Sequence, residues 1–316
     1  MFKKLFVLLL VLSSVIMLSS CQEKEQYDIV TTLFPQYDMA RAIAGDELTV
    51  HNILPFGTSP HGFEITSKDR QIIESSSLFI YTSDELELWA TELSLNDTTI
   101  LNLEIESEAE HDHDHEDEDE HEDDHEHEDV HYWTNPDTMR HMVHVILDHI
   151  IEIKPELETV FTSRAESYLD QLTAYDQSLL SFLTLYEDVD LELYIAGHNA
   201  MAEFGEHYGI EIISLFPDFI PDAELSSLEL TTFTQELIEK GIQAFFIEPV
   251  FDVEPLAANT IVNEFSSRNL TISFYELHQF HNISATDFEN QLTLFDLFEN
   301  NIENIKTVVE LNYGTR

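Results

Sequence analysis

The chain of 316 residues contains a single cysteine, Cys21. One cysteine cannot form an intramolecular disulfide, and it leaves the rest of the chain without a cysteine metal site. Positive charge is also scarce, because 13 Lys and Arg stand against 63 Asp and Glu and give a formal net charge of −50. Such a surface repels nucleic acid and attracts divalent cations. We therefore expect no nucleic-acid partner.

Two motifs of energy-coupled and hydrolytic chemistry are absent from the sequence. There is no G-x-x-x-x-G-K-[ST] phosphate loop, so any transport that involves this chain must be driven by a partner ATPase. There is also no H-E-x-x-H zinc-protease motif, and no pairing of a base with a nucleophile stands out. We therefore expect no catalytic residues and no enzyme activity.

The N-terminal residues have the layout of a secretory signal. Two lysines precede an apolar run over residues 5–18, which is too short to span a bilayer. The run ends in Leu-Ser-Ser-Cys21, which resembles the lipobox of bacterial lipoproteins. The resemblance implies a signal peptide over 1–20, lipidation of Cys21 and an anchored tether over 21–27. An ordinary signal peptide with a chance cysteine is the alternative.

Residues 111–129 consist only of His, Asp and Glu. Because this tract has no apolar side chain to bury, we predict a disordered loop over 104–129. Neutral imidazoles in a strongly negative field suit weak, auxiliary binding of divalent metal, whereas a charged linker is the simpler alternative. Carboxylates favour the protonated form of neighbouring imidazoles, so this binding should fade at mildly acidic pH. The imidazoles are those of His111, His113, His115, His121, His125 and His127.

Short apolar runs alternate with helical periodicity along the rest of the chain. This alternation predicts an α/β fold with two lobes of mainly parallel sheet. The N-terminal lobe is expected over 28–136 and the C-terminal lobe over 188–316. Between them lies a helical segment over 137–187, whose long helix over 156–186 would join the lobes rigidly. The predicted strands cover residues 28–33, 49–54, 78–82, 99–103, 191–196, 211–215, 244–247 and 270–277.

Three histidines stand where a predicted strand or the acidic tract gives way to a loop: His61, His131 and His198. Ligands of open α/β sheets bind beyond the carboxyl ends of the strands, so these three are candidate metal ligands. The other histidines outside the tract and before residue 278 are interpreted as surface or hydrogen-bonded residues. They are His51, His141, His144, His149 and His207.

Four short motifs surround these residues in a characteristic order. They are PFGTSPHGFE over 55–64, HYWTNP over 131–136, GHNAMAEF over 197–204 and FIEP over 246–249. Together they resemble the substrate receptors of metal-importing ABC transporters, the zinc-specific ZnuA/AdcA-like group. The resemblance covers nearly the whole mature chain. It implies a metal held in a cleft between two lobes.

The resemblance also implies a ligand set. His61 and His131 would come from the first lobe, and His198 with a carboxylate from the second. Imidazole at position 198 favours zinc over manganese, since oxygen-rich sites suit manganese better. The sequence departs from the family at the fourth ligand, where we expect Glu276, with His278 next and His281 as a third candidate. Glu248 is expected to cap or hydrogen-bond near the hinge.

These observations predict a receptor outside the cytoplasm, anchored to the bacterial cell membrane, that captures Zn²⁺ and delivers it to an ABC importer permease with its ATPase. We expect a monomer. Two alternatives remain: a secreted zinc-dependent hydrolase, which would keep an open coordination position, and a metal-buffering surface adhesin. Receptors of this kind can also serve in cell adhesion.

Overall fold

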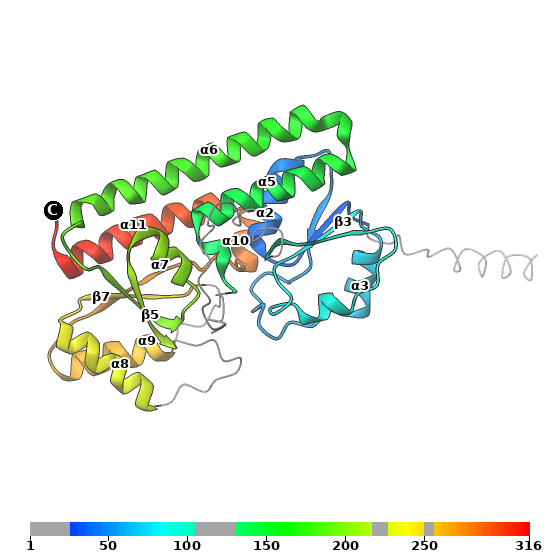
Figure 1. Cartoon of the computed structure of the whole chain (residues 1–316). Helices are drawn as coiled ribbons and strands as arrows, with labels where there is room; N and C mark the ends of the chain where they lie inside the picture. The colour runs from blue at the N-terminus through cyan, green and yellow to red at the C-terminus, as the bar shows by residue number, and fades with distance from the viewer. Residues whose placement is uncertain (1–25, 105–129, 217–226, 250–255) are drawn as a thin grey trace, which may run out of the picture.

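The computed structural model describes residues 26–104, 130–216, 227–249 and 256–316. The predicted signal peptide, Cys21 and the six tract histidines lie outside the described residues. The described residues form two four-stranded parallel sheets flanked by helices (Figure 1). The predicted α/β architecture with two lobes is therefore confirmed.

The two sheets have the same strand order. The first sheet runs β2-β1-β3-β4 and the second β6-β5-β7-β8. Each strand coincides with or overlaps one of the predicted apolar runs, because central parallel strands are covered on both faces. The strands are β1 (Ile29–Thr31), β2 (Val50–Asn52), β3 (Leu78–Tyr81), β4 (Thr99–Asn102), β5 (Glu192–His198), β6 (Glu211–Phe216), β7 (Ala244–Ile247) and β8 (Ser273–Glu276).

Helices connect the strands and cover the sheets. Pro35 ends the first apolar run and also occupies the first turn of α2, where a missing N–H costs nothing. The α-helices are α2 (Phe34–Ala44), α3 (Ser67–Glu74), α5 (Pro136–Ile153), α6 (Glu158–Leu183), α7 (Ala202–Tyr208), α8 (Ser227–Lys240), α9 (Leu256–Ser267), α10 (Ala285–Glu289) and α11 (Leu294–Tyr313). Short 3-10 turns are η1 (Leu88–Glu92), η2 (Tyr132–Thr134), η3 (Pro155–Leu157) and η4 (Thr184–Tyr186).

Two long helices link the lobes, where the sequence led us to expect one. The first half of α6 packs in the N-terminal core and its last turns pack in the C-terminal core. Helix α11 lies alongside α6 (Figure 1) and also contributes to both cores. Phe295 and Phe298 of α11 are buried with the first lobe, and Ile305 and Val309 with the second.

The segment that follows β8 returns to the N-terminal lobe. Phe280 and Ile283 are buried in the N-terminal core. Phe288 of α10 stacks on Phe56 with ring centroids 3.9 Å apart. By packing, this segment therefore belongs to the first lobe, although the sequence assigned all of 188–316 to the second. Its apolar side chains fit either core, so periodicity alone could not place them.

No helix among the described residues combines the length and the apolar character that crossing a membrane requires.

Candidate metal centre

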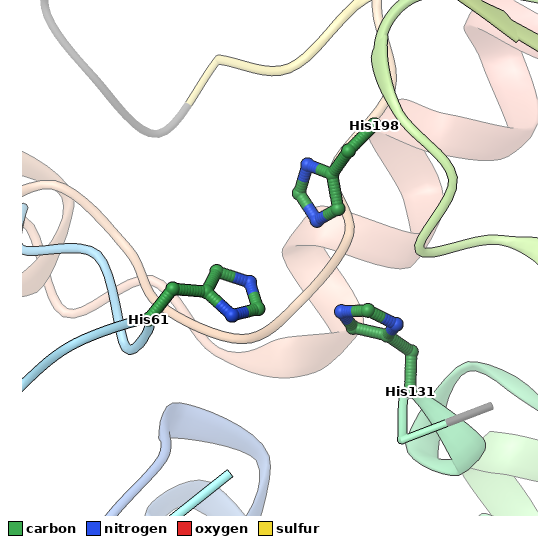
Figure 2. Close-up of side chains that lie close together, drawn as sticks. All are labelled: His61, His131 and His198. Atoms are coloured by element: carbon green, nitrogen blue, oxygen red, sulfur yellow. The ribbon is translucent and has the colours of Figure 1, made fainter. Parts of the chain in front are cut away.

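His61, His131 and His198 lie close together although 137 positions separate the first from the last. One potential ligand atom from each residue lies within 4.8 Å of the corresponding atoms of the other two. Figure 2 shows the three rings converging from three separate parts of the chain. Ligand atoms around tetrahedral zinc are ~3.3 Å apart, so small side-chain shifts would bring the three nitrogens to one ion.

The loop that carries His61 follows β2 and is held by the segment after β8. The side-chain amide of Asn282 donates to the carbonyl oxygens of Pro55 at 3.0 Å and Thr58 at 2.7 Å. Gly57 N–H donates to the carbonyl of Ile283 at 2.7 Å. Gly57 adopts a φ of 79°, which favours glycine. The His61 loop is thus fixed by residues more than 200 positions away.

His131 precedes the 3-10 turn η2 and is 2 % exposed. Its carbonyl accepts from the N–H and the hydroxyl of Thr134, both at 3.1 Å. The next residue, Tyr132, donates its hydroxyl to the carbonyl of Thr82 at 2.9 Å. The indole of Trp133 donates to the carbonyl of Gln279 at 3.1 Å. Both flanking contacts hold the turn, so the imidazole is presented from a rigid base.

His198 is the last residue of β5, in the C-terminal sheet. The pairing of β5 with β6 is irregular between Ile195 and His198. The side-chain amide of Gln279 donates to the carbonyl of His198 at 3.3 Å. Gln279 is fully buried and its carbonyl also accepts from the indole of Trp133, so it links the Trp133 side chain, close to His131, with the backbone of His198. A strand end therefore places this imidazole at the boundary between the lobes.

Glu276 is not part of this group. It is the exposed last residue of β8, and its carbonyl accepts from the side chain of Asn304 at 2.9 Å. In an extended chain Glu276 and His278, two positions apart, would point to the same face. The strand instead ends at Glu276, and Phe280 takes a φ of 67°, a left-handed conformation that a bulky residue adopts only when its surroundings enforce it.

Glu248 and His281 stand beside the three histidines. His281 is 1 % exposed, and its ring centroid lies 6.2 Å from those of both His61 and His198. Its Nε2 atom lies 2.9 Å from Oε1 of Glu248, while Oε2 of Glu248 lies 3.8 Å from Nδ1 of His198. Glu248 thus lies between the imidazoles of His281 and His198. Sequence spacing ranked His281 third because it could not show this convergence.

His278 is not part of the group formed by the three histidines. It is 4 % exposed and its backbone exchanges two hydrogen bonds with the side chain of Asn301, at 2.7 and 2.8 Å. Its ring packs near Phe280. Burial lowers the pKa of His278 to about 4, with the neighbouring imidazole of His281 acting in the same direction and Glu248 opposing. His278 is therefore a neutral, buried residue at neutral pH.

Burial and crowding also keep His61 neutral. Burial first, and then the nearby rings of His281, His198 and His131, lower the pKa of His61 to about 2. A neutral imidazole has a lone pair to offer a metal without first losing a proton. Burial would raise the pKa of Glu248, but His281 and His198 outweigh it and hold that pKa at about 2. A negatively charged carboxylate therefore stands close to the neutral imidazole of His61.

This donor set can hold a borderline divalent cation. Three imidazoles converge, a fourth lies nearby, and one carboxylate balances part of the ion's charge. Nitrogen-rich sites favour zinc, whereas manganese prefers carboxylate, carbonyl and water oxygens. Among the described residues, no other cluster of His, Cys, Asp or Glu brings three potential ligand atoms this close together.

Comparison with known proteins agrees with the motifs. The family model described as "Zinc-uptake complex component A periplasmic", named ZnuA, matches residues 29–308. The zinc-binding protein AdcA of Streptococcus pyogenes is 25 % identical over 299 residues, which cover 90 % of this chain and 56 % of that protein. This chain thus spans about half the length of its streptococcal relative. The high-affinity zinc uptake system protein ZnuA of Bacillus subtilis is 23 % identical over 323 residues, which cover 97 % of this chain and 98 % of that protein.

Solved structures share the fold. The Zn(II)-bound ZnuA-like domain of Streptococcus pneumoniae AdcA superimposes with a TM-score of 0.70 at 20 % identity, covering 90 % of this chain and 99 % of that chain. The periplasmic zinc-binding protein TroA of Treponema pallidum gives a TM-score of 0.73 at 18 % identity, with coverage of 90 % and 99 %. These structures confirm the predicted fold, and the match to the family model over residues 29–308 confirms the family resemblance.

Proposed function

The chain belongs to the ZnuA family of periplasmic zinc-uptake components, and on that premise we propose that it is the receptor that captures Zn²⁺ for an ABC importer. The observation that carries this proposal is the convergence of His61, His131 and His198, from both lobes, to within 4.8 Å. Zn²⁺ is the transported substrate, and Mn²⁺ fits this nitrogen-rich set less well.

His281 supplies the fourth ligand in this proposal, in place of Glu276. Its Nε2 faces Glu248, and its buried Nδ1 has no hydrogen-bond partner among the described residues. A carboxylate that accepts from one imidazole nitrogen commonly orients the other nitrogen toward a metal. Glu248 would serve as this orienting carboxylate. The exposed position of Glu276 makes it the weaker candidate.

The remaining parts of the proposal concern delivery. The tract over 104–129 would collect zinc weakly beside the tight site, and Cys21 would carry the lipid anchor that holds the receptor outside the cytoplasm. A membrane permease and its ATPase would accept the metal. The receptor would act as a monomer and would catalyse no reaction.

Zinc titration of the purified mature protein tests the site. We expect one tight Zn²⁺ equivalent and additional weak ones, and deletion of 104–129 should remove only the weak ones. In the deleted background, His61→Ala, His131→Ala and His198→Ala should each weaken the tight site by roughly 100-fold or more. Competition with Mn²⁺ should leave zinc bound.

The control is His144→Ala, because His144 is exposed on α5 away from the three histidines. Its zinc affinity should equal that of the parent. If the tight equivalent disappeared with the tract, or if all three site variants bound zinc like the parent, the proposal would be rejected. A zinc-bound water beside a free carboxylate, seen spectroscopically, would instead favour the hydrolase.

A further inference from the structure

Helix α6 carries one charged residue in an otherwise apolar buried stripe. The stripe joins the N-terminal core to the C-terminal core, and Asp176 stands where it passes from one to the other, between Leu172 and Leu179. The side chain of Asp176 is only 8 % exposed. The buried residues of this stripe are Phe161, Ala165, Tyr168, Leu172, Asp176, Leu179 and Leu183.

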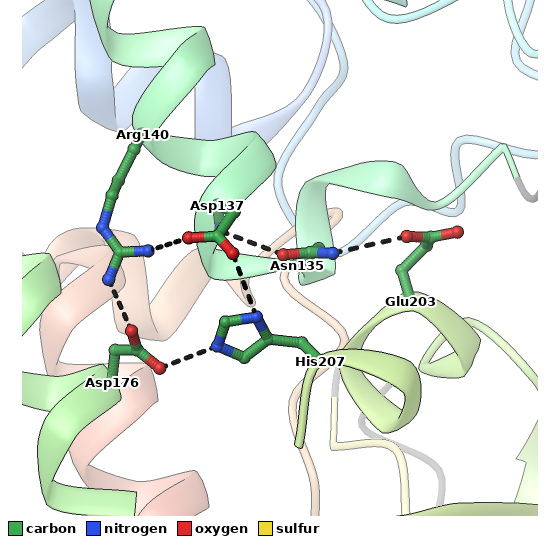
Figure 3. Close-up of polar contacts among 6 residues, drawn as sticks. All are labelled: Asn135, Asp137, Arg140, Asp176, Glu203 and His207. Carbon is green, nitrogen blue, oxygen red and sulfur yellow. Dashed lines mark hydrogen bonds and ion pairs between the residues drawn. The ribbon is translucent and has the colours of Figure 1, made fainter. Parts of the chain in front are cut away.

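The partners of Asp176 come from both lobes, as Figure 3 shows. Arg140 of α5 donates to Oδ2 at 2.5 Å, and α5 packs in the N-terminal core. His207 of α7 places Nε2 2.9 Å from Oδ1, and α7 packs in the C-terminal core. Both carboxylate oxygens are therefore satisfied only while α5 and α7 stay together. Burial raises the pKa of the Tyr208 phenol, and the nearby carboxylate of Asp176 acts in the same direction.

Asp137 closes the network. It pairs with Arg140 one turn along α5, and its Oδ2 lies 3.4 Å from Nδ1 of His207. His207 thus bridges two carboxylates from different helices. Burial raises the pKa of Asp176, but Arg140 and His207 outweigh that effect and hold it below its usual value. A buried charge that loses one partner is strongly destabilising, so separating the helices carries a large penalty.

The network lies beside the metal ligands in the chain. Asn135 follows His131 by four positions, and its side-chain amide lies 3.5 Å from Oε2 of Glu203, five positions after His198. Asn135 also caps α5 by accepting from Asp137 N–H at 2.9 Å. The two contacts between α7 and the α5 region, His207 with Asp137 and Asn135 with Glu203, therefore connect helices that begin within five positions of His131 and His198.

We propose that Asp137, Arg140, Asp176 and His207 form an interlobe latch that sets the separation of His131 and His198 and thereby slows zinc release. This inference rests on the zinc site proposed above. Within it, these four are positioning residues that never touch the metal. Weakening the latch should loosen the lobes and speed dissociation while the ligands themselves remain present.

Two measurements test the latch. Spin labels at Gln71→Cys on α3 and Glu239→Cys on α8, in a Cys21→Ser background, report the distance between the lobes in the zinc-free protein. Stopped-flow release of Zn²⁺ to a chelator reports dissociation. His207→Ala and Asp176→Asn should broaden the distance distribution and speed zinc release by roughly 3- to 30-fold. His207→Gln, which keeps a donor toward Asp176, should give a smaller effect.

The matched control is Arg268→Ala, which removes an exposed ion pair with Glu264 inside the second lobe. It should change neither measurement. Unchanged distance and release rate in folded His207→Ala and Asp176→Asn proteins would overturn the latch. If the parent protein held no tight zinc, the zinc site would fail while the distance measurement still decided the latch by itself.

Discussion

The two lobes share a strand order, but the glutamate that follows the third strand has different surroundings in each lobe. Each lobe has a buried glutamate after its third strand, Glu87 after β3 and Glu248 after β7. Burial raises the pKa of Glu87, whose carboxylate accepts from neutral groups such as the hydroxyl of Thr32 at 2.5 Å. The pKa of Glu248 falls to about 2, because imidazoles surround it. Burial alone therefore does not decide whether the pKa of a carboxyl group rises or falls, because its partners also contribute.

The lobes also contribute ligands from topologically different strands. The first lobe offers His61 after edge strand β2 and His131 in the turn η2, whereas the second offers His198 at the end of central strand β5. The strand equivalent to β5 in the first lobe is β1, which leads to a Thr32–Gln36 hydrogen bond and no histidine. Equal architecture thus supports an asymmetric site, because function depends on side chains at strand ends.

Shortening a buried leucine in either core should give the largest loss of stability. Leu172 belongs to the N-terminal core and Leu179 to the C-terminal core, and both lie on α6 and are buried. Leu172→Ala and Leu179→Ala should each lower the free energy of unfolding by ~2–5 kcal/mol. Urea unfolding followed by circular dichroism measures this. We expect both variants to move one shared transition, since α6 and α11 run through both cores. Two transitions, each sensitive to one variant, would show independent lobes.

Replacing each of the two glutamates by glutamine should have different effects on zinc affinity. Glu248→Gln should weaken zinc binding by roughly 10- to 100-fold, because the orienting negative charge on His281 is lost. Glu87→Gln should leave zinc affinity nearly unchanged, since its carboxyl contacts hydroxyl and N–H groups of the first lobe. Isothermal titration with a competing chelator measures both. Equal losses of affinity would remove the distinction drawn between the lobes.

Acid should destabilise the zinc-free protein through its neutral histidines. The pKa of His278 is about 4 and that of His61 about 2 in the folded chain, against about 6.5 when unfolded. Their contribution is complete above pH 6.5 and is lost as pH falls toward 4 and 2, because the unfolded state then binds more protons. For each histidine, the free energy of unfolding should fall by ~1.4 kcal/mol per pH unit below pH 6.5, until the pH reaches the pKa of that histidine in the folded chain.

Urea unfolding of the metal-free protein between pH 7 and pH 5 measures this dependence, and the His278→Asn variant isolates one of the two residues. The variant should lose stability less steeply with acid than the parent. Identical slopes for the two proteins would show that His278 takes up its proton in the folded chain.

Surface ion pairs should matter least in either lobe. Arg70 and Glu74 form an exposed pair on α3, and Lys240 pairs with Glu192 in the second lobe. Arg70→Ala and Lys240→Ala should each change stability by less than ~1 kcal/mol, because exposed charges are well solvated. Thermal unfolding in low and high salt measures the effect. A large, salt-independent loss in one lobe only would reveal a hidden role for that pair.

Much of the architecture was accessible from the sequence. Each of the eight strands coincides with or overlaps a predicted run, and α6 lies within the predicted 156–186. The second connecting helix was not accessible, because Phe298 and Ile305 of α11 have the same apolar character although they pack in different lobes. Periodicity reports that a face is buried, but not against what it is buried.

The sequence by itself determined that His61, His131 and His198 are candidate ligands, since each follows a strand or a tract and carries a recognisable motif. Only the tertiary structure determined which other side chains lie beside these three histidines. It left Glu276 exposed at the end of β8, brought His281 against Glu248, and set Asp176 between Arg140 and His207. The physical reason is that strand ends and helix faces follow from patterns of a few neighbouring residues. Contacts between residues 30 or more positions apart depend instead on how whole helices and strands pack together.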